Sequence, residues 1–208
     1  VTLQLSWKHQ FQFAGYYIAK EKGFYKDLDI NVNIKEFNFG IDVTNSIIKQ
    51  DNHFAVGRSS LIVEKLNGKN ILLLNATFQE SPLVLLTKKN IKKLSDLEYK
   101  KIMSLDDMSM ASIDAMLTSV GIDSNKYKKQ SHSFNIVDLI ENKTDAMVAY
   151  LSNETYLMQK KGVEYNIYRP SDFDFDFYSD ILYTSENFYQ ENPQLVDHFN
   201  TASLKGWQ

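Results

Sequence analysis

The spacing of apolar and polar residues predicts an alternation of strands and helices along the first part of the chain. Apolar and polar residues alternate over 1–7 and 30–34, the period of a half-buried strand, and helical spacing lies between them over 14–18. Short apolar runs, which are typical of central strands, occupy 54–56, 71–74 and 83–86. This order of elements predicts an α/β protein with mostly parallel sheets.

A second set of alternating elements begins near Lys88. Its predicted strands occupy 102–105, 129–134, 146–150 and 165–168, and a further strand over 177–183 precedes a helix that starts at Pro193. The sequence contains no internal repeat and no Pro-rich linker. We therefore expect two lobes joined by extended crossovers. Lobe 1 is predicted to comprise 1–87 with 179–208, lobe 2 to comprise 88–178, and the crossovers to lie near 82–88 and 176–180.

Composition excludes several classes of function. The chain has 208 residues, is 43% hydrophobic and carries a formal net charge of −3, so it lacks the strong basic field that attracts nucleic acid. No apolar run approaches the roughly 20 residues of a membrane span. Cysteine is absent, which removes disulfides, thiolate metal sites, iron–sulfur clusters and cysteine nucleophiles together.

The other catalytic and metal-binding motifs are poorly represented. The four histidines are scattered, so we expect no metal site, and Val56–Ser60 lacks the second glycine of a nucleophile elbow. No phosphate-binding loop occurs. We interpret the carboxylates at 106–107 and 172–176 as solvated turns and an edge strand, because a catalytic pair needs opposed environments. The sequence thus predicts no catalytic residue, no metal ligand and no cofactor.

Polar and aromatic residues gather where predicted strands end and helices begin. In open α/β sheets this edge binds ligands, because it exposes strand ends and the free N–H groups of helix N-termini. A single residue at such a place is equally well explained by capping or packing, so the prediction depends on several of them coinciding. The candidates from this argument are Trp7, Gln10, Gly57, Ser59, Ser60, Phe78, Tyr150, Asn153 and Glu154.

Several segments together resemble the thiamine-pyrimidine-precursor-binding family, a group of type II periplasmic binding proteins related to the thiamine-pyrimidine synthases of fungi. The resemblance covers nearly the whole chain. It is carried by Ser6–Tyr17, Glu21–Tyr25, Phe54–Gly57, Phe78–Leu86, His132–Asn135, Asp145–Met147, Tyr150–Glu154, Asp176–Tyr178 and Ala202–Trp207. It implies two lobes that close on a small-molecule ligand, with the hinge at the two crossovers.

His132–Asn135 and Ala202–Trp207 are most similar to a branch of this family that is fused to bacterial signalling modules. In that branch the binding domain lies outside the membrane, and a membrane span with PAS, histidine kinase or diguanylate cyclase domains follows. The chain begins within a predicted strand and stops within a helical pattern, so we expect a segment of a longer protein without its targeting signals. The resemblance therefore implies a periplasmic sensor domain that is tethered to the membrane and linked to a cytoplasmic signalling domain.

Two departures from the family pattern bear on activity and ligand. Phe13 stands where the fungal synthases have a reactant histidine, and the chain lacks their cysteine-rich iron motif, so both departures argue against synthase activity. Gln10 and Gln12 stand where the pyrimidine transport proteins have asparagine, which leaves the identity of the ligand open.

The candidate residues suit a flat, amine-bearing heterocycle such as a pyrimidine. The aromatic candidates can stack on its ring, each contact adding about 1 kcal/mol beyond its buried area. Glu154 can accept a hydrogen bond from a ring amino group, while the amides and hydroxyls of the other candidates meet the remaining edges. Asp176 and Tyr178, at the second crossover, are expected to contact the ligand or the hinge.

Three other functions stay open at this point. One is a free binding protein that delivers a thiamine-precursor-like solute to an ABC transporter. Another is an enzyme of the pyrimidine-synthase type, which Phe13 and the missing cysteines weigh against. The last is an adaptor that has lost its ligand.

Overall fold

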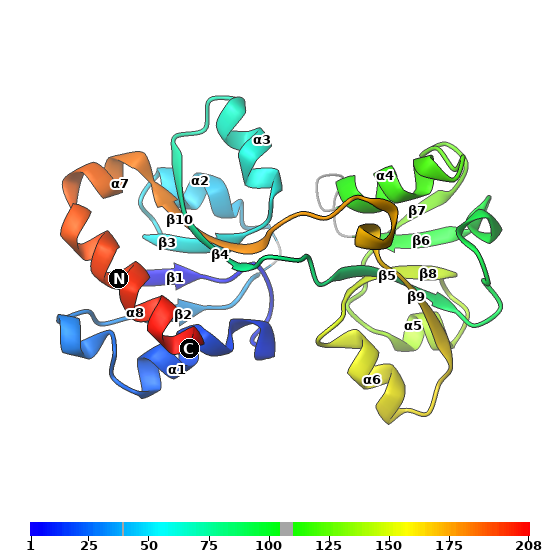
Figure 1. Cartoon of the computed structure of the whole chain (residues 1–208), viewed down its shortest axis with the longest axis horizontal. Coiled ribbons are helices and arrows are strands. Elements are labelled where there is room, and N and C mark those ends of the chain that lie inside the picture. The colour runs from blue at the N-terminus through cyan, green and yellow to red at the C-terminus, as the bar shows by residue number, and fades with distance from the viewer. Residues whose placement is uncertain (39, 105–109) are drawn as a thin grey trace. The chain divides into compact units, whose positions relative to one another are not determined.

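The computed structural model describes residues 1–38, 40–104 and 110–208. The chain forms two compact units, each a sheet flanked by helices (Figure 1). Unit 1 comprises Val1–Gln79 and Tyr178–Gln208, and unit 2 comprises Glu80–Phe177. The chain therefore passes from one unit to the other twice, after Gln79 and after Phe177.

The sheet of unit 1 has five strands in the order β2-β1-β3-β10-β4. Its strands are β1 (Thr2–Gln4), β2 (Asn33–Lys35), β3 (Phe54–Gly57), β4 (Ile71–Phe78) and β10 (Ser179–Ser185). β1 runs parallel to β2 and β3, whereas β10 is antiparallel to both of its neighbours, β3 and β4. The final strand of the chain is thus inserted between two strands from the first half of the sequence.

Both faces of the unit 1 sheet are buried beneath helices. The helices are α1 (Ala14–Glu21), α2 (Val43–Ile48), α3 (Ser60–Leu66), α7 (Glu186–Glu191) and α8 (Pro193–Trp207), with 3₁₀ turns η1 (Phe11–Phe13) and η2 (Lys26–Leu28). Side chains alternate across β3: Phe54 and Val56 enter the core under α1 and α8, while Ala55 enters the core under α2 and α3. Burial on both faces explains why the strand is a continuous apolar run.

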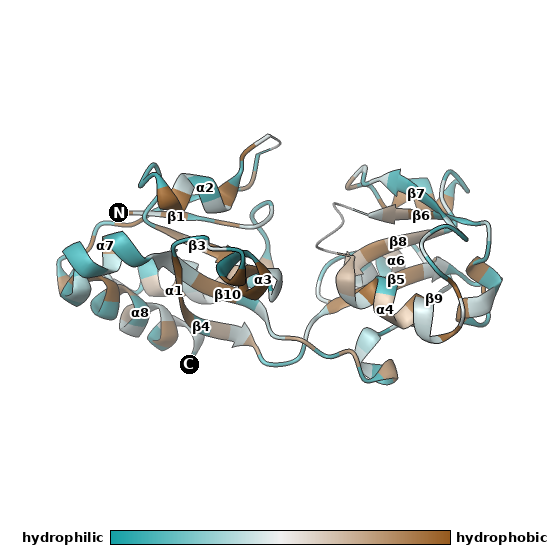
Figure 2. Cartoon of the chain, turned by 90° about the horizontal axis from the view of Figure 1, so that it is seen from above, coloured by the Kyte–Doolittle hydropathy of each residue, from teal (hydrophilic) through white to brown (hydrophobic). Residues whose placement is uncertain are grey.

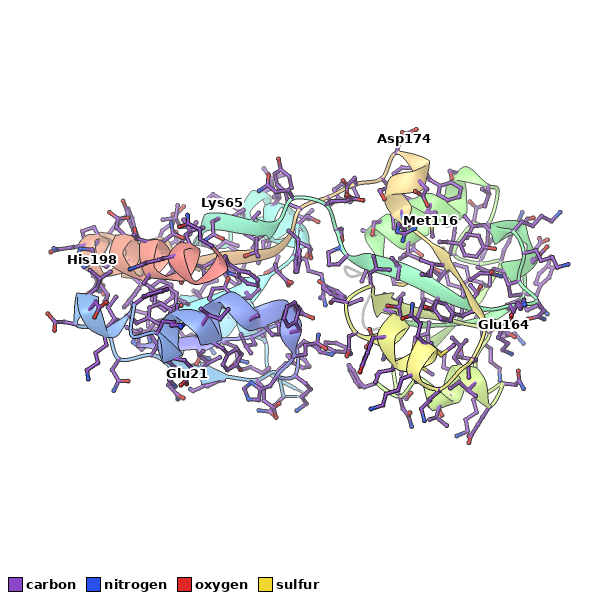
Figure 3. The ribbon with its side chains drawn as sticks, turned by 60° about the horizontal axis from the view of Figure 1, so that its bottom comes forward. Glu21, Lys65, Met116, Glu164, Asp174 and His198 are labelled. Carbon is purple, nitrogen blue, oxygen red and sulfur yellow. The ribbon has the colours of Figure 1, made fainter. Side chains whose placement is uncertain are left out.

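Unit 2 repeats this arrangement with the strand order β7-β6-β8-β5-β9. Its strands are β5 (Leu83–Lys88), β6 (Lys101–Ser104), β7 (Lys128–Ser131), β8 (Ala146–Tyr150) and β9 (Tyr165–Tyr168). Its helices are α4 (Ala111–Ser119), α5 (Val137–Ile140) and α6 (Glu154–Lys160), with 3₁₀ turns η3 (Leu94–Leu97) and η4 (Pro170–Phe173). The apolar strands lie inside the unit (Figure 2), and Figure 3 shows the charged Glu21 and Glu164 side chains outside the two cores.

The two-lobed α/β fold is confirmed. Each sheet is mixed: β10 and β5 run antiparallel to both of their neighbours, whereas the other strands of each sheet run in one direction. Residues 83–87 were expected at the end of lobe 1, within a crossover near 82–88, yet the strand β5 that contains them pairs with β8 and β9 in unit 2. Ile71–Leu74 lies in β4 at the edge of its sheet and not at the centre, and only Ile71 of these residues is fully buried.

The two crossing segments are attached to each other on both sides of the crossing. In unit 1, Phe78 at the end of β4 pairs with Ser179 at the start of β10. In unit 2, the backbone N–H of Ser81 donates to Asp176 Oδ1 at 3.1 Å. Both crossings therefore leave unit 1 at the same edge of its sheet.

Helices α1 and α8 pack closely against each other in unit 1 (Figure 1). Their contact depends on two glycines. A Cβ on Gly206 would lie 2.1 Å from the carbonyl oxygen of Gly15, and a Cβ on Gly15 would lie 2.2 Å from the Trp207 ring. Trp207 in turn contacts Tyr16 edge-on, with ring centroids 5.7 Å apart. The C-terminal helix is thereby held against the helix that follows the first strand.

We predict that Gly206→Ala destabilises unit 1 by about 1–3 kcal/mol, because the added methyl forces the two helix backbones apart. Helix propensity alone predicts the opposite sign, since alanine is favoured over glycine within a helix. Both tryptophans, Trp7 and Trp207, lie in unit 1, so urea unfolding followed by tryptophan fluorescence reports this unit.

The matched control is Thr201→Ala on the exposed face of the same helix, which should change the free energy of unfolding by less than about 0.5 kcal/mol. A Gly206→Ala protein as stable as the wild type, or more stable, would show that the two helices are not held at this glycine contact.

Candidate functional site

Strand register brings most candidates of unit 1 to one edge of its sheet. β1, β3 and β4 all end at this edge, and the antiparallel β10 begins there. Gly57 lies opposite Ile181, and Phe78 lies opposite Ser179. Trp7 lies three residues beyond the end of β1, so the observed strand is shorter than the predicted strand over 1–7. This edge is also the one from which both crossings leave the unit.

The unit 1 candidates at this edge are half-buried, as expected of residues that line a site. They are Trp7, Gln10, Gly57, Ser59, Ser60 and Phe78. Ser59 occupies the N-cap position of α3 but makes no side-chain capping hydrogen bond. Gly57 has a packing explanation, because a Cβ there would lie 2.7 Å from Leu61 Cδ1. Phe78 packs edge-on near Trp207, with ring centroids 6.4 Å apart.

In unit 2 the structure brings Tyr150, Asn153 and Glu154 into direct contact. The Tyr150 backbone N–H donates to Glu154 Oε2 at 2.8 Å, and Asn153 Nδ2 donates to Glu154 Oε1 at 2.8 Å. Glu154 is 8% exposed and begins α6, so its carboxylate also meets the positive end of that helix. Each oxygen keeps a second lone pair, so the fixed carboxylate can still accept a hydrogen bond from a ligand.

His132 is attached to β8, the strand that ends at Tyr150, and was not among the predicted site residues. Its Nε2 donates to the Val148 carbonyl at 2.9 Å, and its Nδ1 accepts from the Phe134 backbone N–H at 2.9 Å. These two bonds define the neutral tautomer that carries the proton on Nε2. Burial lowers the pKa of His132 below its ordinary value, while the Val148 carbonyl and the Glu154 carboxylate oppose that shift. The only sequence signal for His132 is the family resemblance of 132–135.

A second residue that the sequence does not single out is Asp180. It is 0% exposed, lies in β10 with a positive φ of 46°, and accepts hydrogen bonds from Gln12 Nε2 at 3.3 and 3.4 Å. Burial raises the pKa of Asp180 to about 7, while Arg58 and the Gln12 hydrogen bond act in the opposite direction. A left-handed backbone at a non-glycine residue within a strand is uncommon and points to a constrained position.

The two candidates at the second crossing differ in their surroundings. Asp176 is exposed and binds the Ser81 N–H, so its observed contact joins the two crossing segments. Tyr178 is 56% exposed at the start of the return to unit 1. Phe13, which replaces the synthase histidine, is 0% exposed in the unit 1 core.

No metal-binding group of three or more His, Cys, Asp or Glu side chains occurs within 1–38, 40–104 and 110–208. The predicted carboxylate pair Asp106 and Asp107 lies outside the described residues. The other acidic cluster begins within η4 and continues past its end, and its Asp172, Asp174 and Asp176 are exposed to solvent. Within the part of the chain that the structure describes, helices that are both long and apolar enough to cross a membrane are absent.

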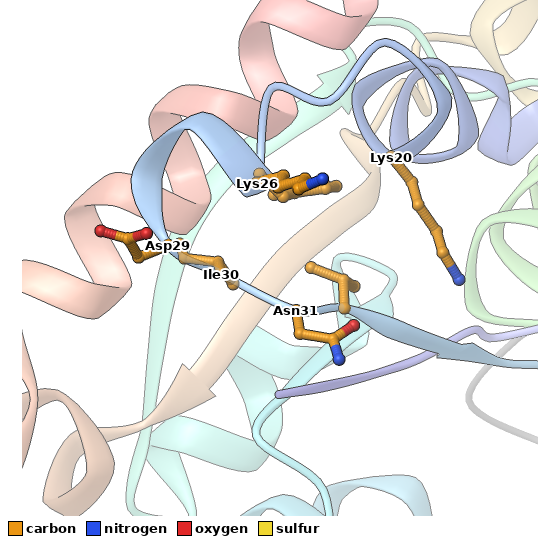
Figure 4. Close-up of a pocket in the computed structure, with 7 residues that line it drawn as sticks. Lys20, Lys26, Asp29, Ile30 and Asn31 are labelled. Carbon is orange, nitrogen blue, oxygen red and sulfur yellow. The ribbon is translucent and has the colours of Figure 1, made fainter.

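A surface hollow of about 520 Å³ lies at another place in unit 1 (Figure 4). It is lined by residues of α1, η2 and the segment before β2, among them Lys20, Lys26 and Asn31. β1, β2 and β3 are parallel, so the start of β2 lies at the sheet edge opposite the candidate residues. The hollow therefore does not belong to the candidate site.

Comparison with known sequences supports the fold and the class of function. The sequence model of a family described as NMT1/THI5 like matches residues 10–208. A curated relative, the riboflavin-binding protein RibY of Chloroflexus aurantiacus, is 27% identical over 216 residues and is aligned with 99% of this chain. The chain spans 61% of the length of that relative, which is less than two thirds.

Solved structures of periplasmic binding proteins share the fold at low sequence identity. A protein from Bordetella bronchiseptica has a TM-score of 0.82 at 16% identity, covering 99% of this chain and 70% of its own. The alkanesulfonate-binding protein SsuA from Xanthomonas axonopodis bound to MOPS has a TM-score of 0.72 at 12% identity, covering 100% and 77%. A substrate-binding protein of a Streptococcus pneumoniae ABC uptake transporter with bound histidine has a TM-score of 0.70 at 15% identity, covering 100% and 87%.

We predict that Asp180→Asn changes how the stability of unit 1 depends on pH. The pKa of an aspartate carboxyl is about 3.9 in the unfolded chain. When its pKa is higher in the folded protein, its contribution to stability is fully present at low pH. That contribution is lost as the pH rises from about 4 to about 7. The difference in unfolding free energy, variant minus wild type, should therefore rise across this window by at most about 1.4 kcal/mol per pH unit, then level off.

Urea unfolding followed by tryptophan fluorescence at several pH values measures this difference. Asp197→Asn, an exposed carboxylate on α8 of the same unit, serves as the control and should show no such slope. Parallel pH profiles for wild type and Asp180→Asn would contradict a raised pKa at Asp180.

Proposed function

Because the chain belongs to the NMT1/THI5-like family, we propose that it is an extracytoplasmic solute-binding sensor domain that closes on a flat heterocycle and signals to a fused cytoplasmic module. The observation that carries the proposal is the position of the candidates in each unit. Trp7, Gln10 and Phe78 surround the edge of unit 1 from which both crossings leave. Tyr150 and Glu154 lie at the end of β8 in unit 2. Tyr150 pairs with Leu83 at the start of β5, where the chain enters unit 2 after the first crossing.

The hydrogen-bonding groups favour a ligand that donates. The Glu154 carboxylate can only accept, and its two protein donors hold both oxygens in place before the ligand arrives. A preorganised acceptor rejects a ligand that lacks the matching donor, because the carboxylate would then be desolvated without a partner. The half-buried Trp7 and Phe78 supply aromatic surface that suits the faces of a ring. An amine-bearing or N–H-bearing heterocycle satisfies both requirements.

Closure would work by a shift of population between open and closed forms. A ligand that contacts both units only in the closed form stabilises that form by its differential affinity. The paired crossing segments, joined at Phe78–Ser179 and at Ser81–Asp176, are suited to act as the hinge. We assign Asp176 to this hinge and Tyr178 to the adjacent, exposed part of the ligand site.

The second candidate function is delivery of a solute to an ABC transporter, favoured by the transporter-associated proteins that share the fold. Our preference for a sensor rests on the resemblance of 132–135 and 202–207 to the signalling branch of the family. The complete gene separates the two: a membrane span followed by a signalling domain supports the sensor, and a lipoprotein signal with a stop soon after residue 208 supports the transporter protein. Synthase activity is disfavoured, since the position of the reactant histidine is held by Phe13 in the core.

We predict that the protein binds 2-aminopyrimidine or riboflavin saturably in calorimetric titrations, and that Trp7→Ala combined with Glu154→Ala weakens this binding at least about tenfold. The double variant loses a stacking surface and the preorganised acceptor, which together are worth more than about 1.4 kcal/mol.

The matched control replaces an exposed aromatic and an exposed carboxylate of unit 2, Tyr99→Ala with Glu141→Ala, and should bind like the wild type. Wild-type affinity in the Trp7→Ala/Glu154→Ala protein would place the ligand elsewhere. Tight binding of MOPS or free histidine in preference to both rings would overturn the heterocycle assignment.

A further inference from the structure

Three hydrogen-bonded polar side chains connect the interior of unit 1 with the sheet edge that carries the candidate residues. At the buried end, both oxygens of Asp180 accept from Gln12 Nε2, at 3.3 and 3.4 Å. Gln12 is itself 2% exposed, and its Oε1 accepts a hydrogen bond from Gln10 Nε2. Gln10, at the other end, is half-buried and is one of the predicted ligand contacts. We call these three side chains the Asp180–Gln12–Gln10 relay.

The charge of Asp180 dictates the direction of every hydrogen bond in the relay. An ionised carboxylate only accepts, so Gln12 must turn Nε2 toward Asp180 and Oε1 toward Gln10. Gln10 must then present Nε2 to Gln12, which leaves its own Oε1 facing away from the relay. A ligand that contacts this oxygen of Gln10 therefore contacts a hydrogen-bond acceptor.

Protonation of Asp180 permits the opposite arrangement. The neutral carboxylic acid has one O–H donor, which can bind Gln12 Oε1 once the Gln12 amide turns by half a rotation. Gln12 Nε2 then donates to Gln10 Oε1, and Gln10 presents its NH₂ group to the ligand. The proton comes from solvent, and no other group in the relay changes charge.

The surroundings of Asp180 make both states accessible near neutral pH. Its complete burial disfavours the charged form and raises its pKa to about 7. The titratable groups that act on Asp180 in the described chain are Arg58, from the turn after β3, and Tyr16, from α1. Arg58 favours the ionised form of Asp180, whereas the buried Tyr16 hydroxyl has a pKa raised far above neutrality and stays uncharged.

We propose that Asp180 is a specificity-determining positioning residue that acts through Gln12 to fix whether Gln10 offers the ligand an acceptor or a donor. The proposal rests on the proposed function, because it takes Gln10 as a ligand contact. It narrows the ligand class: with Asp180 ionised, the ligand carries an N–H or amino donor opposite Gln10. With Asp180 protonated, the same position selects a ligand with an acceptor such as an ether or carbonyl oxygen.

The first test needs no ligand. In the whole chain, the side-chain amide NMR signals of Gln10 and Gln12 should shift with pH together and with one common midpoint. Asp180→Asn should abolish both shifts, since an asparagine does not titrate in this range, whereas Asp197→Asn should leave them unchanged. Gln12→Leu interrupts the relay in the middle and should abolish the Gln10 shift while Asp180 is still present. A Gln12 shift without a Gln10 shift in the wild type, or a Gln10 shift that survives Gln12→Leu, would overturn the proposal.

The second test compares the affinities for two probes, 2-aminopyrimidine and 2-methoxypyrimidine. The amino group of the first can donate a hydrogen bond, whereas the methoxy oxygen of the second can only accept one. Neither probe titrates near neutral pH. The preference for the amino probe should fall roughly tenfold from about pH 8 to about pH 5.5. In Asp180→Asn the preference should not depend on pH. A pH-independent preference in the wild type would overturn the role in specificity. Binding of neither probe, with Gln10 and Gln12 still titrating together, would contradict the pyrimidine ligand and leave the relay supported.

Discussion

The insertion of β10 between β3 and β4 is the constraint on which the organisation of unit 1 depends. β10 comes back from unit 2 and enters antiparallel to both neighbours, so its first residues lie where β3 and β4 end. Both crossings must therefore attach to the edge that carries the candidate residues. The same insertion buries Asp180 and brings it beneath Gln12, 168 positions away in sequence. The C-terminal helix α8 packs through Gly206 against Gly15 of α1, and this contact holds the returning segment in place.

Much of this fold can be predicted from the pattern of apolar residues. Phe54–Val56 and Leu83–Leu86 are apolar at every position because their strands are covered on both faces. Strand direction cannot be predicted in this way, since an antiparallel inner strand such as β10 has the same burial as a parallel one. The assignment of β5 to the wrong lobe has the same origin. An apolar run indicates burial, and only its pairing with β8 and β9 shows in which sheet it lies.

The candidate site was partly predictable for a related reason. Strand ends and helix starts are visible in the sequence, which is why Tyr150, Asn153 and Glu154 could be named before their contacts were known. Gln12 is visible in the sequence as a departure from the family pattern, but its contact with Asp180 escapes such reasoning because it joins η1 to the final strand. An acidic residue inside an apolar strand pattern at Asp180 is the one local signal for it. The resemblance to the signalling branch of the family identified 132–135 as a motif, but the attachment of His132 to Val148 of β8 emerges only from the structure.

In the proposed mechanism, the two units close on a heterocycle and the chain bends at the two crossings. The absence of cysteine allows a direct measurement, because two introduced cysteines are the only sites for thiol-specific spin labels. Leu66→Cys in unit 1 and Tyr156→Cys in unit 2 replace side chains that are 82% and 59% exposed. Pulsed electron spin resonance should show the distribution of distances between the labels shift and narrow when 2-aminopyrimidine or riboflavin saturates the protein, and no such change in the Trp7→Ala background. Saturable binding with an unchanged distance distribution would contradict the account.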